Sequence, residues 1–222
     1  VEDSKANKYF YSLYKYCNYQ AKIINNSFLG LEYIINGIKI FSNLIGTFNT
    51  YNILALFALC NILELNRNQI IKRISRLKSI EGRFDYISTK DNKIGIIDYA
   101  HTPDALKKIL LTINEIKNKK GKIISVFGCG GNRDKEKRPI MAEIAVGYSD
   151  IIIITSDNPR NENPAIIIND ILKGIPKKLI KEIYIIENRY EAIQKACELS
   201  NNYYIILIAG KGHEKYQEIN GV

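Results

Sequence analysis

Beyond residue 83, short apolar runs alternate with stretches in which apolar residues recur every three or four positions. The apolar runs predict strands at 94–98, 122–127, 151–155, 183–186 and 203–208. The recurring pattern predicts helices at 103–118, 137–148, 164–173 and 189–200. Strands and helices that alternate at this spacing are typical of a parallel sheet with helical crossovers. We therefore expect an α/β fold with a mainly parallel sheet.

The first part of the chain follows a different pattern. Two β-like runs, at 33–35 and 38–40, are joined by Asn36-Gly37, which is a hairpin-turn signal. Helices are expected at 49–65 and 69–78, where the apolar residues have helical spacing. Gly82 interrupts the second pattern. We place a domain boundary there, which gives domains at 1–81 and 82–222.

Four of the predicted strands end in polar loops that are rich in Gly or Pro. These loops cover 98–104, 128–134, 157–160 and 209–214. In an open parallel sheet, the loops at the carboxyl ends of the strands line the ligand crevice. We therefore expect the four loops to converge on one binding site.

The loop Asp157-Asn158-Pro159-Arg160 carries the clearest chemical signal. A guanidinium group presents a planar fork of donors that can hold a carboxylate or a phosphate through two parallel hydrogen bonds, which Lys cannot do. The loop therefore indicates an acidic ligand.

The other three loops each allow a structural and a functional interpretation. In the first loop, a capped helix explains Thr102 and Pro103. It does not explain Asp98, because a carboxylate at a strand end is costly unless it is paired. In nucleotide-binding folds such a carboxylate commonly binds a ribose hydroxyl. The glycines of 128–131 do not form a dinucleotide fingerprint, and the loop could be a solvated basic loop. In the last loop, no Ser or Thr follows Lys211, and the spacing does not match that of a phosphate-binding loop.

Composition and charge exclude several classes of protein. Hydrophobic residues make up 46% of the 222 positions, which is ample for a packed core. The net charge of +9 permits nucleic-acid binding, but Lys and Arg are scattered rather than clustered. Four Cys without a CxxC pair, and only two His, argue against a zinc site or a disulfide framework. We expect no membrane span and no nucleic-acid partner, but a cytoplasmic monomer whose two ends are cut from a longer protein.

Together the loops resemble the motifs of one family in order and spacing. Gly82-Arg83, 98–106, 128–139, 157–160 and 209–214 resemble the Mur ligase family over residues 44–220. The resemblance implies that 1–81 is the end of a central ATP-binding domain. It also implies that 82–222 is most of a Rossmann-like, amino-acid-binding C-terminal domain, truncated at its end.

The resemblance further implies ATP-dependent amide formation in peptidoglycan biosynthesis, with ATP and Mg²⁺ as cofactors. The implied substrates are UDP-N-acetylmuramoyl-L-alanyl-D-glutamate and meso-diaminopimelate, joined through an acyl phosphate. The family's phosphate-binding loop, metal ligands and catalytic residues have no counterpart in this sequence. We expect them upstream, and we expect the chain alone to be inactive.

Carried over position by position, the family's binding residues fall into two groups. Those implied for ATP are Asn52, Arg83, Asp98 and His101. Those implied for meso-diaminopimelate are Arg133, Asp157, Asn158, Pro159, Arg160, Gly210 and Glu214. Three alternatives stay open: a related ligase that adds L-lysine or another amino acid, a non-catalytic amino-acid-binding remnant, and a basic nucleic-acid binder.

Overall fold

The computed structural model describes residues 5–178 and 181–221. The chain divides into two compact units, Val1–Ser79 and Ile80–Val222. Each unit has its own sheet. In the described residues, no helix combines the length and the apolar character that a membrane span requires.

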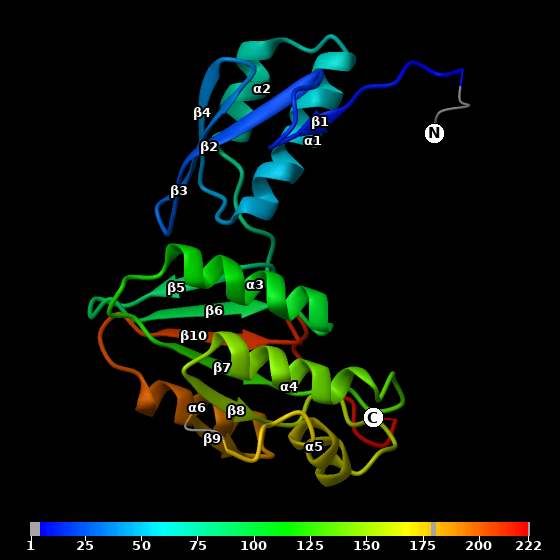
Figure 1. The fold of residues 1–222 in the computed structure, drawn as a ribbon, viewed down its shortest axis with the longest axis vertical. Helices are drawn as coiled ribbons and strands as arrows, with labels where there is room; N and C mark the ends of the chain where they lie inside the picture. The colour runs from blue at the N-terminus through cyan, green and yellow to red at the C-terminus, as the bar shows by residue number, and fades with distance from the viewer. Residues whose placement is uncertain (1–4, 179–180, 222) are drawn as a thin grey trace. The chain divides into compact units, whose positions relative to one another are not determined.

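The N-terminal unit is a small sheet packed against two helices (Figure 1). Its strands are β1 (Tyr11–Ser12), β2 (Tyr19–Ser27), β3 (Gly30–Ile35) and β4 (Ile38–Ser42), in that spatial order, and its helices are α1 (Thr47–Ile62) and α2 (Arg67–Ile74). The predicted hairpin is confirmed, since β3 and β4 pair antiparallel. Asn36 and Gly37 both have positive φ, 44° and 84°, as a tight two-residue hairpin turn requires.

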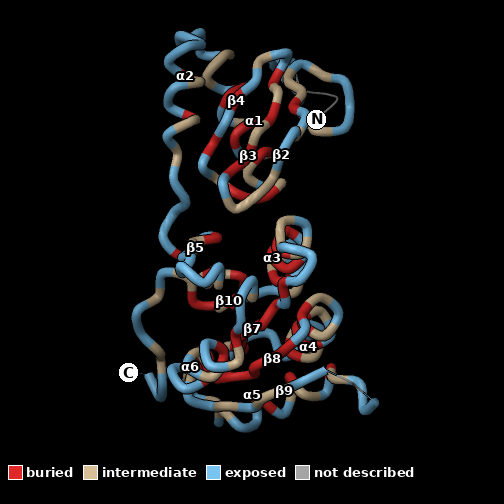
Figure 2. Tube along the Cα trace, turned by 90° about the vertical axis from the view of Figure 1, so that its left-hand side faces the viewer, coloured by how far each residue is buried: buried red, intermediate tan, exposed pale blue. Residues whose placement is uncertain are grey.

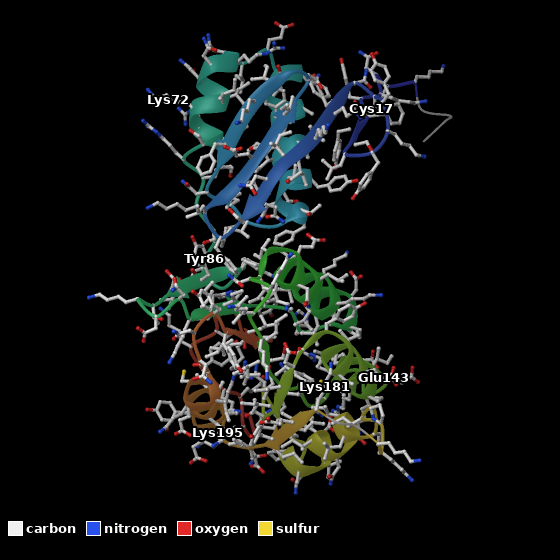
Figure 3. The ribbon with its side chains drawn as sticks, turned by 60° about the vertical axis from the view of Figure 1, so that its left-hand side comes forward. Cys17, Lys72, Tyr86, Glu143, Lys181 and Lys195 are labelled. Carbon is white, nitrogen blue, oxygen red and sulfur yellow. The ribbon has the colours of Figure 1, made fainter. Side chains whose placement is uncertain are left out.

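The core of this unit lies between β3 and the two helices. Alternate residues of β3, namely Leu31, Tyr33 and Ile35, are fully buried and face a cluster that includes Phe57 of α1. Lys72 on α2 points away from this core (Figure 3). The sheet therefore buries one face, which explains the alternation in the sequence.

The C-terminal unit has a six-stranded sheet in the order β5-β6-β10-β7-β8-β9. Its strands are β5 (Asp85–Ser88), β6 (Ile94–Asp98), β7 (Ile123–Phe127), β8 (Ile151–Ile154), β9 (Glu182–Ile185) and β10 (Ile205–Ala209). Its helices are α3 (Pro103–Ile116), α4 (Lys137–Tyr148), α5 (Pro164–Leu172) and α6 (Arg189–Leu199). All neighbouring strands pair parallel except β5, which runs antiparallel to β6. The predicted α/β fold with a mainly parallel sheet is confirmed.

Helices cover both faces of this sheet (Figure 2). Ile124 and Val126 of β7 pack on Ala192 and Ala196 of α6 on one face. The residue between them, Ser125, turns to the other face, where its hydroxyl lies 2.6 Å from that of Ser149 at the end of α4. The central strands β7 and β8 are buried on both faces, which explains why their sequences are nearly continuous apolar runs.

The strand order places four strand-end loops on one edge of the sheet. Strands β6, β10, β7 and β8 are consecutive neighbours and all run in the same direction. The segments 98–104, 209–214, 128–134 and 157–160 therefore leave the sheet side by side. This is the convergence that the sequence predicts.

Candidate functional site

The four loops enclose a pocket of about 330 Å³. Its lining includes Tyr99, His101 and Thr102 after β6, Gly128, Cys129, Gly130 and Arg133 after β7, Asp157, Asn158 and Arg160 after β8, and Gly210 and Glu214 after β10. Both basic and acidic side chains face this space. A pocket with that lining suits a small ligand that carries charges of both signs.

A buried lysine organises the acidic side of the pocket. Lys211 Nζ donates to Asn158 Oδ1 at 2.7 Å and to Glu214 Oε2 at 3.2 Å, and it lies 3.8 Å from Asp157 Oδ1. Asn158 Nδ2 also donates to Glu214 Oε2 at 3.0 Å. This network joins the loops after β8 and β10, and it fixes the amide and both carboxylates before any ligand arrives.

Glu214 stays ionised in this setting. Burial opposes its negative charge, but hydrogen bonds from Asn158 and Lys211, together with the charge of Lys211, lower the pKa of the carboxyl group below its ordinary value. The carboxylate is therefore available to accept hydrogen bonds from an ammonium group at neutral pH.

The basic side of the pocket is formed by Arg160 and Arg133. Both side chains flank Gly130, since a Cβ at that glycine would lie 3.0 Å from Arg160 Nη1 and 3.8 Å from Arg133 Cγ. Arg160 Nη1 donates to the carbonyl oxygen of Gly131 at 2.9 Å. The notch that glycine leaves at 130 thus holds two guanidinium-bearing side chains next to each other, which favours an anionic ligand.

The loops after β7 and β8 touch through their backbones. A Cβ at Gly131 would overlap the carbonyl oxygen of Pro159. We expect Gly131→Ala to push the two loops apart and to weaken binding of an acidic ligand about 10-fold, the equivalent of about 1.4 kcal/mol. Gly147→Ala on α4 is the matched control, because no atom lies within 4 Å of its Cβ position. Equal ligand affinity in the two variants, measured by calorimetry, would contradict this arrangement.

A fully buried arginine, Arg138, supports the loops after β7 and β8. Arg138 of α4 donates through Nη1 to Asp170 at 2.9 Å and through Nη2 to Glu162 at 3.0 Å. Its Nη2 also lies 3.3 Å from the carbonyl oxygen of Gly130, and Glu162 accepts from the backbone N–H of Asn132. Arg138 therefore connects the 130–132 turn to α5 and to the segment that precedes it.

Asp98 has a structural partner that the sequence did not reveal. Its carboxylate accepts from the backbone N–H groups of Phe84 at 2.7 Å and Ala100 at 2.8 Å. Burial raises the pKa of this carboxyl group, although the two hydrogen bonds and nearby Arg83 oppose the increase. Asp98 thus anchors the turn at Phe84, where φ is 46°. Binding of a ribose hydroxyl stays a prediction.

Aromatic rings line the side of the pocket near Asp98. The guanidinium carbon of Arg83 lies 4.5 Å from the ring centroid of Tyr99, within the range of a cation–π contact. Tyr99 stacks on His213 at 5.7 Å and meets His101 edge-on at 4.7 Å. Arg83 is therefore linked to the pocket through the Tyr99 ring.

The structure brings together most, but not all, of the residues expected in the site. His101, Arg133, Asp157, Asn158, Arg160, Gly210 and Glu214 line the pocket. Pro159 lies outside it, beside Ser156 and Gln217. Asn52 lies on α1 in the N-terminal unit, where its Nδ2 is 3.4 Å from Asn49 Oδ1. Its expected contact with adenine stays a prediction.

Three residues of the site, Tyr99, Lys211 and Arg138, are not among those that the sequence motifs predict. Lys211 does not match a phosphate-binding loop, but a lysine between two glycines directly after a buried strand is itself a signal of a site. Cys129, which also lines the pocket, is buried against Met141. Burial raises the pKa of its thiol to about 12, so it is not a ready nucleophile.

The profile of the family described as "Mur ligase, glutamate ligase domain" matches residues 82–212. The chain belongs to the Mur ligase family. The matched range includes three of the loops, residues 209–212 of the fourth, and all of the pocket lining except Glu214, which lies two residues beyond it. The resemblance inferred from the motifs is confirmed.

Among the relatives, a protein of Cytophaga hutchinsonii is 44% identical over 222 residues, which is 100% of this chain and 46% of that protein. One of Aquifex aeolicus is 44% identical over 92% of this chain and 40% of that protein. Both are named UDP-N-acetylmuramoyl-L-alanyl-D-glutamate–2,6-diaminopimelate ligase. The chain spans less than half the length of these Mur ligases. Since the first alignment covers all 222 residues, the similarity also extends to residues 1–43.

Solved structures agree with the fold. The structure of a UDP-N-acetylmuramoyl-L-alanyl-D-glutamate–2,6-diaminopimelate ligase is 34% identical and superposes with a TM-score of 0.68, covering 96% of this chain and 44% of that one. A UDP-N-acetylmuramate–alanine ligase of Thermotoga maritima is 22% identical with a TM-score of 0.70, covering 91% and 44%. The second match supports the fold alone.

Proposed function

We propose that this chain supplies the amino-acid-binding part of an ATP-dependent ligase of peptidoglycan biosynthesis. The ligase would add meso-diaminopimelate to UDP-N-acetylmuramoyl-L-alanyl-D-glutamate, the reaction that the names of the relatives describe. The observation that carries the proposal is one pocket that is lined by Arg133, Arg160 and the ionised Glu214. Diaminopimelate carries carboxylate and ammonium groups, and the pocket offers a partner for each.

The residues of this chain would bind and orient the amino acid. In the complete ligase, the D-glutamyl carboxylate would accept the γ-phosphoryl group of ATP, which gives an acyl phosphate and releases ADP. Glu214 and Asp157 would hold one ammonium group, while the guanidinium of Arg160 would hold the carboxylate beside it. The free amine at the other end would attack the acyl carbon, form the amide bond and release phosphate and a proton. Fixed positions of the reactants lower the barrier of such a step.

For the nucleotide, Arg83 would face the γ-phosphate, Asp98 the ribose and Asn52 the adenine, with His101 close by. Among the described residues, no group of three or more His, Cys, Asp or Glu side chains is arranged to hold a metal ion. The use of Mg²⁺ by the complete ligase stays a prediction. The cytoplasmic location, the monomeric state and the two domain assignments stay predictions.

The same geometry supports a preference for diaminopimelate over lysine. The two amino acids differ by one carboxylate, and without that group the pocket-facing Nη donors of Arg160 would lack their ligand partner, although Glu218 and Gly131 still bind the rest of the guanidinium. A site built around a polar contact can reject an analogue that lacks it by roughly four orders of magnitude. A related ligase that adds lysine would gain nothing from this arginine.

The test is a ligation assay on the complete reading frame, with diaminopimelate and lysine supplied separately. We expect amide formation with diaminopimelate. The kcat/KM for lysine should be lower than that for diaminopimelate by a factor of at least roughly 1,000. Equal rates with lysine would contradict the proposed substrate. Binding of diaminopimelate without any ligation would favour a non-catalytic remnant.

A further inference from the structure

The segment 217–220 lies along the loop that carries Arg160. The backbone N–H of Arg160 donates to the carbonyl oxygen of Glu218 at 3.0 Å, and its carbonyl oxygen accepts from Asn220 at 2.8 Å. The backbone N–H of Glu218 donates to Asn158 Oδ1 at 2.9 Å. Arg160 has a φ of 52°, a conformation that non-glycine residues seldom adopt. The segment 217–220 thus holds the backbone of Arg160 in place.

The side chain of Glu218 also holds the guanidinium group. Its Oε2 lies 2.9 Å from Arg160 Nε, while Nη1 donates to Gly131. A guanidinium can bind a carboxylate from the side, through Nε and one Nη, or end-on through Nη1 and Nη2. Because Glu218 already accepts from Nε, a ligand carboxylate can bind this guanidinium only end-on, through Nη1 and Nη2. Gly131 accepts one N–H of Nη1, and within 5–178 and 181–221 the other Nη hydrogens have no acceptor, so they can bind a ligand carboxylate.

Glu218 is not itself part of the pocket lining, whereas Arg160 is. Its carboxylate therefore does not occupy the ligand space. The backbone hydrogen bonds on either side of it tie its position to the loop and not to the ligand. These observations distinguish a support for Arg160 from an internal substitute for the ligand carboxylate.

We propose that Glu218 is a positioning residue for amino-acid recognition: it fixes Arg160 so that the end-on edge of the guanidinium faces the pocket. The inference rests on the proposed function, since it assigns the ligand carboxylate to Arg160. It deepens that function by adding a residue that acts on specificity through another side chain. Removal of Glu218 should therefore affect diaminopimelate and spare lysine.

Calorimetric titration of this chain with diaminopimelate and with lysine tests the inference. We expect Glu218→Leu to weaken diaminopimelate binding about 10-fold, the scale of one charge-assisted hydrogen bond, and to leave lysine binding within about 2-fold. Glu218→Gln keeps an oxygen acceptor for Nε and should restore most of the loss. The matched control is Glu143→Gln on α4, whose side chain is exposed and points away from the sheet (Figure 3).

The outcomes separate the inference from the proposed function. If the unaltered chain shows no preference for diaminopimelate, both fail. If that preference is present and Glu218→Leu binds diaminopimelate equally or more tightly, the inference alone is overturned, because a competing carboxylate would have that effect. If Glu218→Leu does not unfold cooperatively, the diaminopimelate affinity of Glu218→Gln tests the inference instead. A loss of about 2- to 3-fold relative to Glu143→Gln is expected, and no loss overturns the inference.

Discussion

Replacing Arg160 with Lys should weaken diaminopimelate binding by about 100-fold and leave the KM for ATP nearly unchanged. The loss corresponds to about 2.7 kcal/mol, within the range for a hydrogen-bonded charged group whose partner is removed. A lysine retains the positive charge but offers a single ammonium in place of the planar fork. It also cannot donate to Glu218 and Gly131 at the same time with the geometry seen for Arg160.

Arg67→Lys is the matched control, because Arg67 is exposed on α2 of the N-terminal unit. Calorimetry on the chain gives the affinities, and a ligation assay on the complete reading frame gives the two KM values. Equal increases in the KM for diaminopimelate and for ATP would mean that Arg160 supports the site as a whole. That result would remove the basis for the proposed selectivity.

Replacing Arg138 with Met should lower the free energy of unfolding of the C-terminal unit by about 3 kcal/mol. Arg138 is 0% exposed, and its removal leaves Glu162 and Asp170 without their buried partner. The 130–132 turn would also lose a hydrogen bond at Gly130. Thermal or urea unfolding measures the change, with Arg76→Met on the surface of the N-terminal unit as the control.

The effect of Arg138→Met should depend on pH in a defined direction. The backbone N–H of Asn132 and the side chain of Arg138 lower the pKa of Glu162, while Lys173 and Arg138 lower that of Asp170. A lowered carboxyl pKa stabilises the folded state above the ordinary value of about 4, and this contribution is lost as the pH falls through the lowered pKa. The two proteins should therefore converge in stability at acid pH. A difference that stays constant from pH 7 to pH 3 would contradict this explanation.

The sequence predicted the central sheet better than its edges. Strands such as Ile151–Ile154 are buried on both faces, so their apolar runs are evident without any tertiary information. The hydrophobic pattern does not predict the edge strand β5, nor β1 and β2 of the N-terminal sheet. The four residues of β5 are half-buried or exposed, and they form a strand because they pair with β6. Their hydrophobic pattern alone therefore carries little information.

For the site, too, the sequence predicts what depends on local pattern and does not predict what depends on tertiary contacts. Loops that follow buried strands could be placed on one edge of the sheet because parallel strands share a direction. The roles of Glu218 and Arg138 depend on contacts with Arg160 and Asp170, which are distant in the sequence. Asp98 was expected to need a partner, but not the backbone of Phe84. Such pairings follow from the packing and not from local spacing.

The position of β10 has a consequence for how the polypeptide is made. Of the six described strands of this sheet, β10 is the last to be translated, yet it pairs with β6 on one side and β7 on the other. Until residue 209 leaves the ribosome, the earlier strands form two separate ribbons with open edges, which invite aggregation. A nascent chain would thus acquire its ligand pocket in one late step, and a stop codon a few residues before 205 would leave two unjoined half-sheets.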